Sequence, residues 1–172
     1  MKIQLQKDIN GLILDIGGGG EGVISQLYPD QVIAIDKNRN ELEEAPGDAV
    51  KIMMDASSMS FTDHCFENIT TFYSFMFISK SEHYNVVSEV TRVLKPKGRL
   101  HIWDTKIVEA NPFMIDLDIQ FRECSIHTTY GIYKDNAYQD ADYFKNMMND
   151  FGFVLVREDN DSGHFYQCWQ KN

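Results

Sequence analysis

Cysteine is scarce in this chain of 172 residues, and the three cysteines present, Cys65, Cys124 and Cys168, lie far apart. An odd number without Cys-x-x-Cys spacing predicts neither a disulfide framework nor a zinc site, so we assign these side chains to packing. Long apolar runs are also missing. The longest, residues 72–78, is interrupted by Ser74 and is too short to span a bilayer, and residues 1–7 lack a secretory h-region. We expect a cytoplasmic protein without a membrane partner.

Positive charge is low, with 16 Lys and Arg residues against 26 Asp and Glu residues and a formal net charge of −10. Binding to a nucleic-acid backbone depends on Lys and Arg, so this balance argues against a nucleic-acid partner. Solubility explains the charge, and steering of cationic substrates is the alternative. The length predicts one domain, residues 1–172, that buries about 70% of its unfolded surface.

A glycine-rich loop follows an apolar segment at residues 12–22. Four consecutive glycines, residues 17–20, each cost roughly 0.5–1 kcal/mol relative to alanine, and they are tolerated where a positive φ or close approach of a ligand is required. Gly17, Gly19 and Gly22 satisfy G-x-G-x-x-G, and residues 31–36 form a further apolar segment ending in Asp36. An acid there binds ribose hydroxyls, which fits both a nicotinamide dinucleotide and S-adenosylmethionine.

Glu21 and Asp15 bear on this choice. Glu21 lies where a dinucleotide would place its pyrophosphate, at the start of a helix that would otherwise attract anions. A carboxylate there opposes phosphate and favours the positive sulfonium of S-adenosylmethionine. Asp15 belongs to a segment expected to be a buried strand, where an unpaired carboxylate costs several kcal/mol. We expect Asp15 to have a hydrogen-bonding partner.

Four motifs occur in order: Leu-Asp-Ile-Gly-Gly-Gly, the acid Asp36, Met-Asp-Ala at residues 54–56, and Arg-Val-Leu-Lys-Pro-Lys-Gly at residues 92–98. Together they resemble the class I S-adenosylmethionine-dependent methyltransferases over residues 11–104, and more loosely beyond. Two positions depart from that family's pattern. Glu21 stands where the third glycine is usual, and the usual Lys-Pro-Gly-Gly turn reads Lys-Pro-Lys-Gly.

The resemblance implies S-adenosylmethionine as the cofactor and gives roles to several residues. By this comparison, Gly17 and Gly19 approach the methionine part of the cofactor. Asp15 helps to order the loop and the cofactor's amino group, and Asp36 holds the ribose.

The adenine end is assigned by the same comparison. Lys37 would flank the adenine, and Asp55 would accept a hydrogen bond from its exocyclic amine, with Ala56 alongside. Ser74 and Phe75 would close the pocket. The Asn/Asp-Pro-Pro-aromatic motif that the family uses to methylate exocyclic amines of bases or glutamine is missing from residues 73–78.

Strands alternate with helices along the chain, which predicts a parallel sheet with crossover connections. The expected fold is α/β: a Rossmann-like, seven-stranded, mostly parallel sheet with helices on both faces and a C-terminal antiparallel hairpin strand. Further strands are expected at 49–55, 69–75 and 99–104. A helix should lie between the last two, with Ser79 and Glu82 as a capping box and with Pro96 and Gly98 ending it.

Several polar residues have competing interpretations. Asp104 ends the strand at 99–104, at the edge where such sheets bind ligands, but a strand-terminal Asp also caps turns. We assign His101 and Trp103 to the core or to helix packing. His64 and His83 have no partners at metal-ligand spacing, and we expect them to face solvent.

The C-terminal part predicts a helix after Asp140 with Phe144, Met147 and Met148 on one face and Gly152 as its end. Strands at 153–158 and 164–169 should form a hairpin. Between these elements and the fifth strand, residues 105–138 alternate apolar and polar side chains, which predicts an inserted hairpin. It would act as a lid over the ligand edge, with Tyr130, His127 and Tyr133 nearest the substrate; packing elsewhere or forming a homodimer are the alternatives.

The sequence therefore predicts a methyltransferase that transfers the methyl group of S-adenosylmethionine to a small-molecule acceptor. Catalysis would rest on alignment of the reactants, and no residue is singled out as a catalytic base. Two other functions stay open at this point: an NAD-dependent oxidoreductase, and a cofactor-binding scaffold without turnover.

Overall fold

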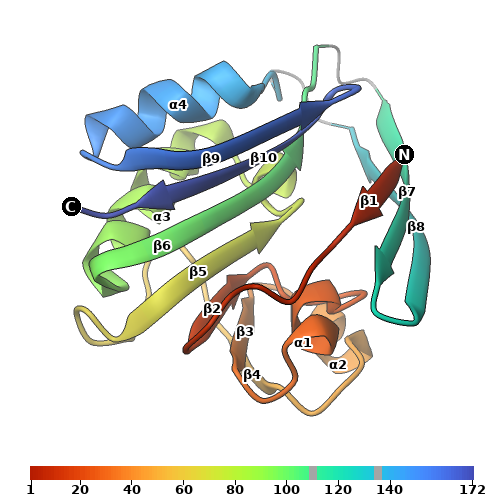
Figure 1. Ribbon diagram of the computed structural model, residues 1–172, viewed down its shortest axis with the longest axis horizontal. Coiled ribbons are helices and arrows are strands. Elements are labelled where there is room, and N and C mark those ends of the chain that lie inside the picture. The colour runs from red at the N-terminus through yellow and green to blue at the C-terminus, as the bar shows by residue number, and fades with distance from the viewer. Residues whose placement is uncertain (109–111, 134–136) are drawn as a thin grey trace.

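The computed structural model describes residues 1–108, 112–133 and 137–172. Within these residues, seven strands form one sheet in the order β4-β3-β2-β5-β6-β10-β9 (Figure 1). Neighbours from β4 to β6 are parallel, whereas β10 is antiparallel to both β6 and β9. The sheet confirms the Rossmann-like arrangement with a C-terminal antiparallel hairpin. Its strands are β2 (Ile13–Ile16), β3 (Val32–Asp36), β4 (Val50–Met53), β5 (Phe66–Phe72), β6 (Leu94–Thr105), β9 (Val154–Asp161) and β10 (His164–Gln170).

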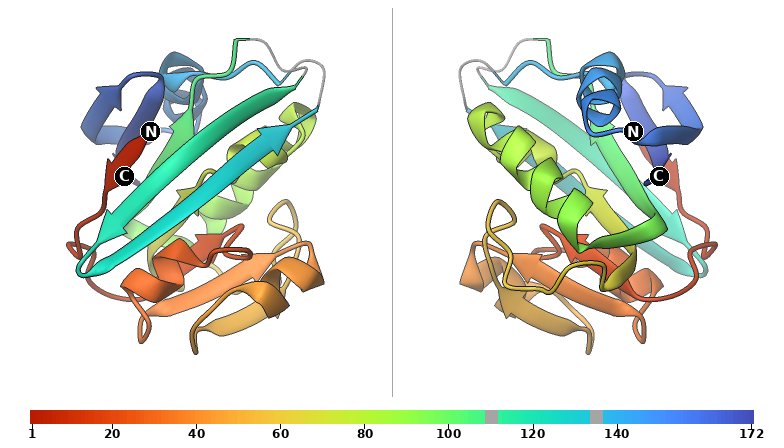
Figure 2. Two further views of the ribbon diagram at one scale, coloured as in Figure 1. Left: turned by 90° about the vertical axis from the view of Figure 1, so that its right-hand side faces the viewer. Right: turned by 90° about the vertical axis from the view of Figure 1, so that its left-hand side faces the viewer.

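Helices pack on both faces of this sheet, as expected for a sheet whose central strands are buried on both sides. One face is covered by α3 (Lys80–Val93) and α4 (Ala141–Asp150), whose buried side chains include Val86, Val90, Phe144 and Met147. On the other face lie α1 (Val23–Leu27) and α2 (Arg39–Glu44). Figure 2 shows the two faces from opposite sides. Among the described residues, no helix has the length and apolar character needed to cross a membrane.

A second, three-stranded sheet contains the inserted hairpin, which we define as β7 (Phe113–Phe121) and β8 (Cys124–Ile132). Residues 109–111 and 134–136 of the predicted segment lie outside the described residues. The third strand, β1 (Lys2–Gln4), pairs parallel to β7 with Ile3 opposite Ile119. Leu117, Ile119 and Phe121 are buried, so the hairpin packs on the α1 side of the main sheet (Figure 2). The sequence predicted the hairpin but gave the N-terminal segment no part in it.

Element boundaries differ from prediction around α3. The helix ends at Val93, and β6 begins at Leu94, so Pro96 and Gly98 belong to a strand. Ser79 is the N-cap residue, but its side chain makes no capping hydrogen bond, so the predicted capping box does not form. His83 is buried rather than solvent-facing, and its Nδ1 lies 3.0 Å from the Tyr143 hydroxyl.

The predictions for His64, His101 and Trp103 are confirmed. His64 is exposed. His101 is buried and stacks on the partly buried Trp103, with ring centroids 5.9 Å apart. Both side chains therefore contribute to packing on one face of β6.

The C-terminal elements follow the sequence closely. Asp140 caps α4 by accepting a hydrogen bond of 2.8 Å from the amide of Tyr143. The strands β9 and β10 are joined by Ser162 and Gly163, both with positive φ, as a two-residue hairpin turn requires. This turn places His164 at the ligand edge of the sheet, beside the end of β6.

Candidate functional site

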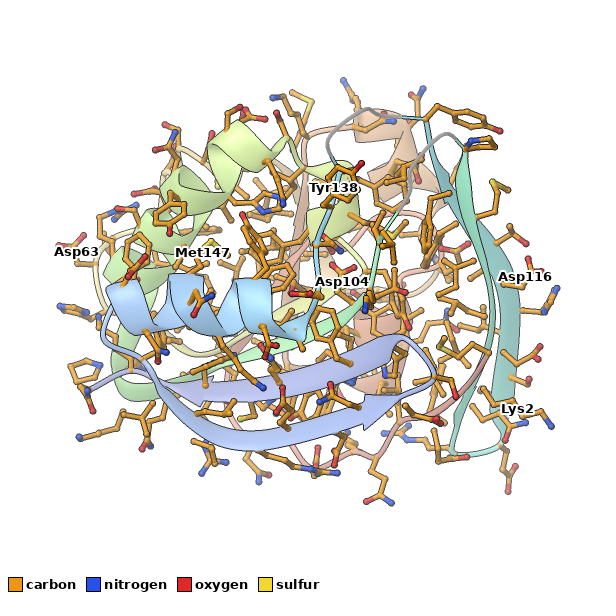
Figure 3. All side chains as sticks on the ribbon, turned by 90° about the horizontal axis from the view of Figure 1, so that it is seen from above. Lys2, Asp63, Asp104, Asp116, Tyr138 and Met147 are labelled. Atoms are coloured by element: carbon orange, nitrogen blue, oxygen red, sulfur yellow. The ribbon has the colours of Figure 1, made fainter. Side chains whose placement is uncertain are left out.

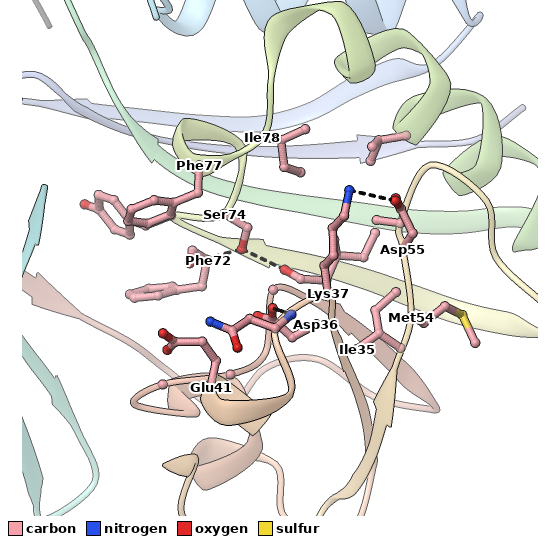
Figure 4. A pocket seen from close by; sticks show the side chains of 18 of the residues that line it. Ile35, Asp36, Lys37, Glu41, Met54, Asp55, Phe72, Ser74, Phe77 and Ile78 are labelled. Atoms are coloured by element: carbon pink, nitrogen blue, oxygen red, sulfur yellow. Dashed lines mark hydrogen bonds and ion pairs between the residues drawn. The ribbon is translucent and has the colours of Figure 1, made fainter. Parts of the chain in front are cut away.

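A cavity of about 1350 Å³ opens at the carboxyl ends of the parallel strands β2, β3, β4 and β5 (Figure 4). Its walls come from the glycine loop after β2, from α2, from the segment after β5 and from β8. Open α/β sheets bind ligands at this edge. The cavity volume suits a cofactor together with a small second substrate.

The glycine loop has no room for side chains. A Cβ atom on Gly17 would lie 2.6 Å from the Ser74 hydroxyl oxygen, and one on Gly19 would lie 2.5 Å from Cβ of Glu41. A Cβ on Gly18 would lie 2.7 Å from a carboxylate oxygen of Asp15. The loop therefore presents bare backbone to the cavity, which fits close approach by a ligand.

Asp15 lies beneath this loop and does not line the cavity. Its Oδ1 accepts a hydrogen bond of 2.7 Å from the Thr70 hydroxyl, so the expected partner is present. Burial raises the pKa of Asp15 to about 7, and the bond from Thr70 opposes that rise. The geometry fits a role in ordering the loop, whereas contact with the cofactor's amino group stays a prediction.

Asp36 ends β3 and lines the cavity beside the glycine loop. Its Oδ1 accepts a hydrogen bond of 2.8 Å from the amide of Asn38, and its Oδ2 would lie 3.0 Å from a Cβ on Gly19. The N-cap of α2 is Asn38, whose side chain accepts from the amide of Asn40 at 3.0 Å. Helix capping therefore does not account for Asp36, and a ribose-binding role stays the prediction.

Lys37 and Asp55 meet on the other side of the cavity (Figure 4), and Ala56 also lines it. Lys37 Nζ lies 3.0 Å from Asp55 Oδ2. Ser57 donates to Asp55 Oδ1 from its hydroxyl at 2.7 Å and from its amide at 2.9 Å. These bonds and the lysine lower the pKa of Asp55 to about 2. The structure thus brings Lys37 together with Asp55, which lies 18 positions further along the chain.

Ser74 lines the cavity, but the prediction for Phe75 is wrong. Ser74 donates a hydrogen bond of 2.7 Å to the carbonyl of Ile16. Phe75 is fully buried on the α3 and α4 side, with its ring 5.0 Å from those of His83 and Phe144. The strand ends at Phe72, and Tyr73 adopts a positive φ of 54°, which changes the direction of the chain before Phe75.

Aromatic side chains that the sequence did not single out form one wall of the cavity: Phe72, Tyr73 and Phe77, with Tyr130 of β8. The Tyr130 ring lies 5.8 Å from that of Tyr73 and 5.9 Å from that of Phe77. Tyr130 was predicted to lie near a substrate, and it does line the cavity. His127 and Tyr133 do not: His127 pairs with Asp118 at 2.8 Å on the exposed side of the hairpin, and Tyr133 is 73% exposed.

Asp104, labelled in Figure 3, is fully buried and does not reach the cavity. Its Oδ1 accepts hydrogen bonds from the amide of Thr105 at 2.8 Å and from Gln139 Nε2 at 2.6 Å. Among the described residues, Oδ2 has no hydrogen-bond partner. Burial raises the pKa of Asp104 to about 7 despite these two bonds. We therefore assign Asp104 to support of the fold, by bonding β6 to the segment that returns from the inserted hairpin.

Glu21 connects the glycine loop to the inserted hairpin. Its carboxylate accepts hydrogen bonds from the hydroxyls of Thr128 and Tyr130, the latter at 2.8 Å. These residues are 107 and 109 positions away in the chain, so no local pattern could have shown the contact. The hairpin is thereby held against the cavity by side chains of the cavity wall.

The cavity wall is strongly acidic. Among the described residues it has two cationic side chains, Lys37, which pairs with Asp55, and Arg39, which pairs with Glu43 at 2.9 Å. A pyrophosphate would meet repulsion here, whereas a cationic ligand would be attracted. The six carboxylates of the wall are those of Glu21, Asp36, Glu41, Glu44, Asp55 and Glu82.

Comparisons with known proteins agree with this geometry. A family model described as a methyltransferase domain matches residues 14–102, more than half of the chain. A ubiquinone/menaquinone biosynthesis C-methyltransferase, UbiE, from Desulfotalea psychrophila is 34% identical over 104 residues, covering 55% of this chain and 42% of the relative. The chain therefore spans less than half the length of that curated relative.

Solved structures show the same fold at low sequence identity. The protein PH0226 from Pyrococcus horikoshii has a TM-score of 0.73 and 17% identity, covering 95% of this chain and 84% of that chain. An S-adenosylmethionine-dependent methyltransferase from Methanosarcina mazei has a TM-score of 0.69 and 21% identity, covering 97% and 94%. A cyclase, SpnF, reaches 0.71 at 14% identity, covering 95% and 76%, so the fold alone does not define the chemistry.

The family model covers the glycine loop, the acid ending β3, the Asp55 segment and the segment after β5, which line the cavity together with β8 outside the match. On this match, the chain belongs to the class I S-adenosylmethionine-dependent methyltransferase family, whose cofactor is S-adenosylmethionine.

Proposed function

We propose that this protein transfers a methyl group from S-adenosylmethionine to a small-molecule acceptor. One observation carries the proposal: the bare glycine loop, the ribose-binding candidate Asp36 and the aromatic wall face a single acidic cavity. When bound, S-adenosylmethionine supplies an activated methyl group on a positively charged sulfur. Within the described residues, the acidic wall has no unpaired cation, which supports that cofactor over a pyrophosphate.

The residues of this chain would contribute in two ways. Gly17 and Gly19 allow close backbone approach, while Asp36 and Asp55 offer carboxylates to the ribose and the adenine amine. Phe72, Phe77 and Tyr130 offer ring surfaces that exclude water and hold a second ligand. Holding two reactants in line converts a bimolecular step into an effectively unimolecular one, so orientation supplies most of the acceleration.

The aromatic wall also bears on the acceptor. Rings favour flat apolar ligands, because stacking and edge contacts add to area burial. The relative from Desulfotalea psychrophila is named for ubiquinone and menaquinone biosynthesis, and the chain spans 42% of that protein. We therefore extend the proposal no further than a planar, largely apolar small molecule as acceptor.

Two measurements test the proposal in sequence. S-adenosylmethionine or S-adenosylhomocysteine should raise the melting temperature, whereas NAD and NADP should not. Transfer of a labelled methyl group should then be followed across a panel of planar hydroxy-aromatic compounds, with amino acids and oligonucleotides as contrasting acceptors. Stabilisation by NAD alone would reject the methyltransferase proposal. Tight cofactor binding without transfer to any acceptor would instead favour a scaffold without turnover.

A further inference from the structure

Glu21 occupies an unusual place in the cavity wall. It follows the four glycines directly, and both of its carboxylate oxygens accept hydrogen bonds from β8, one from Thr128 and one from Tyr130 at 2.8 Å. Glu21 and Tyr130 both line the cavity, so this bonded pair lies where the glycine loop and the inserted hairpin meet. A glutamate side chain has many rotamers, and two hydroxyl donors hold it in one of them.

In the part of the chain that the structure describes, no ion pair neutralises the charge of Glu21. Within the described ranges, the two cations of the cavity wall bind other carboxylates, since Lys37 pairs with Asp55 and Arg39 with Glu43. Hydroxyl donors orient a carboxylate without cancelling its charge. The negative charge therefore acts on whatever occupies the cavity, and it acts strongly because the partly buried position limits screening by water and salt.

S-adenosylmethionine and its product differ in the charge on the sulfur atom. The methylated cofactor carries a positive sulfonium, and S-adenosylhomocysteine has a neutral thioether in its place, while the adenosine, ammonium and carboxylate groups are the same. We propose that Glu21 determines the preference for the methylated cofactor over the demethylated product, with Thr128 and Tyr130 as positioning residues. This inference rests on the proposed function, and it adds the residue that distinguishes the two states of the cofactor.

The same contacts link cofactor charge to the inserted hairpin. A group that interacts with both the ligand and the hairpin couples them reciprocally: what favours ligand binding also favours the hairpin position that allows it. Loss of the positive charge after methyl transfer removes one of the attractions that hold Glu21 in place. We expect amide exchange in β8 to be slower with S-adenosylmethionine bound than with the product bound.

The first test replaces the charge and keeps the size. Glu21→Gln retains an oxygen acceptor and a shape that Thr128 and Tyr130 can still bind. Calorimetric titration with each cofactor form should show the ratio of the two dissociation constants, product over methylated cofactor, falling by about three- to tenfold. The change should arise from weaker binding of S-adenosylmethionine. Glu123→Gln removes an exposed carboxylate outside the cavity and should change the ratio less than about twofold.

A second variant covers the case in which Glu21→Gln does not fold. Tyr130→Phe keeps the Glu21 charge and removes one of its two donors, so the ratio should fall by about twofold and β8 amides should exchange faster. Tyr133→Phe, on an exposed tyrosine outside the cavity, is its control and should match the wild type.

Equal losses for both cofactor forms, or unchanged affinities, in Glu21→Gln would overturn the inference. If Tyr130→Phe kept the wild-type ratio of dissociation constants, the positioning role of Tyr130 would be overturned. If the wild-type protein bound neither cofactor form, the proposed function itself would fail, which is a separate result.

Discussion

The hydroxyl of Tyr73 lies 2.7 Å from Nδ1 of His164, so the end of β5 is bonded to the start of β10 across the ligand edge of the sheet. The two rings also stack, with centroids 5.7 Å apart. Tyr73 adopts a left-handed backbone conformation, with φ of 54°, that non-glycine residues rarely adopt. Its amide nevertheless donates a bond of 2.8 Å to the carbonyl of Trp103, so the surrounding structure holds it in place.

Removing either partner of this pair should destabilise the protein. We expect Tyr73→Phe and His164→Phe each to lower the free energy of unfolding by about 1 kcal/mol, the usual net value of one buried hydrogen bond. The double variant should lose less free energy of unfolding than the sum of the two single losses, because the same bond can be lost only once. Urea unfolding of the four proteins measures this coupling. Additive losses would show that the pair contributes nothing beyond its separate contacts.

Asp104 should make stability depend on pH. Its folded pKa of about 7 lies above the ordinary value of 3.8, so folding favours the protonated form. That contribution is complete below pH 3.8 and is lost as the pH rises through 7. Relative to Asp104→Asn, which cannot ionise, the wild type should therefore lose up to about 4 kcal/mol of unfolding free energy between pH 4 and pH 8.

Chemical denaturation at several pH values measures the difference in unfolding free energy between the wild type and Asp104→Asn. Other titrating groups affect both proteins alike, so their effects cancel in this difference. Asp30→Asn, at an exposed carboxylate, is the control and should run parallel to the wild type. Parallel curves for Asp104→Asn and the wild type would mean that Asp104 is not buried in the form described.

Gly17 of the glycine loop and Gly47, outside that loop, provide a matched pair of substitutions. Gly17 and Gly47 both have positive φ, at 73° and 90°, but an added Cβ meets Ser74 at 2.6 Å in the first case and nothing within 4 Å in the second. Both alanine variants should lose about 1 kcal/mol of stability through backbone strain, and Gly17→Ala should lose more because its Cβ overlaps Ser74. Gly17→Ala should also lower affinity for S-adenosylmethionine by about tenfold or more, a loss that calorimetry should not detect in Gly47→Ala.

Asp36 tests the ribose assignment. Asp36→Ala should lower cofactor affinity by about 10- to 150-fold, as expected for the loss of hydrogen bonds to a charged group worth roughly 1.5–3 kcal/mol. Folding should persist, because Asn38 and not Asp36 caps α2. Asp36→Asn keeps an acceptor for the Asn38 amide and should show a smaller loss. An unchanged affinity with a lower melting temperature in Asp36→Ala would remove this residue from the site.

Limited proteolysis tests whether the inserted hairpin acts as a lid. Cleavage within residues 105–138 should be slowed by cofactor together with acceptor, because lids belong to the less stable part of a fold. Ile3→Asp, which places a charge in the buried contact with β7, should speed cleavage there. Equal cleavage with and without ligands would favour a packing or dimer role for the hairpin.

The parts of the site that could be predicted from sequence are those encoded locally. The glycines, Asp36 and Asp55 each follow a short apolar strand, and the carboxyl ends of parallel strands meet at one edge whatever the loops between them do. Strand alternation likewise predicted the inserted hairpin, since β7 buries every second residue.

The errors concern features set by distant contacts or by a single backbone angle. Phe75 was misplaced because the left-handed turn at Tyr73 has no sequence signal, tyrosine being an uncommon residue there. His83 was expected in solvent because its partner, Tyr143, is 60 positions away. The contact of Glu21 with β8 depends in the same way on residues that only the folded chain brings together.

The pairing of β1 with β7 also bears on the order of folding. Ile3 and Ile119 are separated by most of the chain, and closing a loop of that length costs more entropy than forming the βα units between them. We expect the seven-stranded sheet to form first and to provide the surface on which the three-stranded sheet later assembles. In pulse-labelling experiments during refolding, amides of β2 and β5 should become protected before those of β1 and β7, so the cavity would form before its cover.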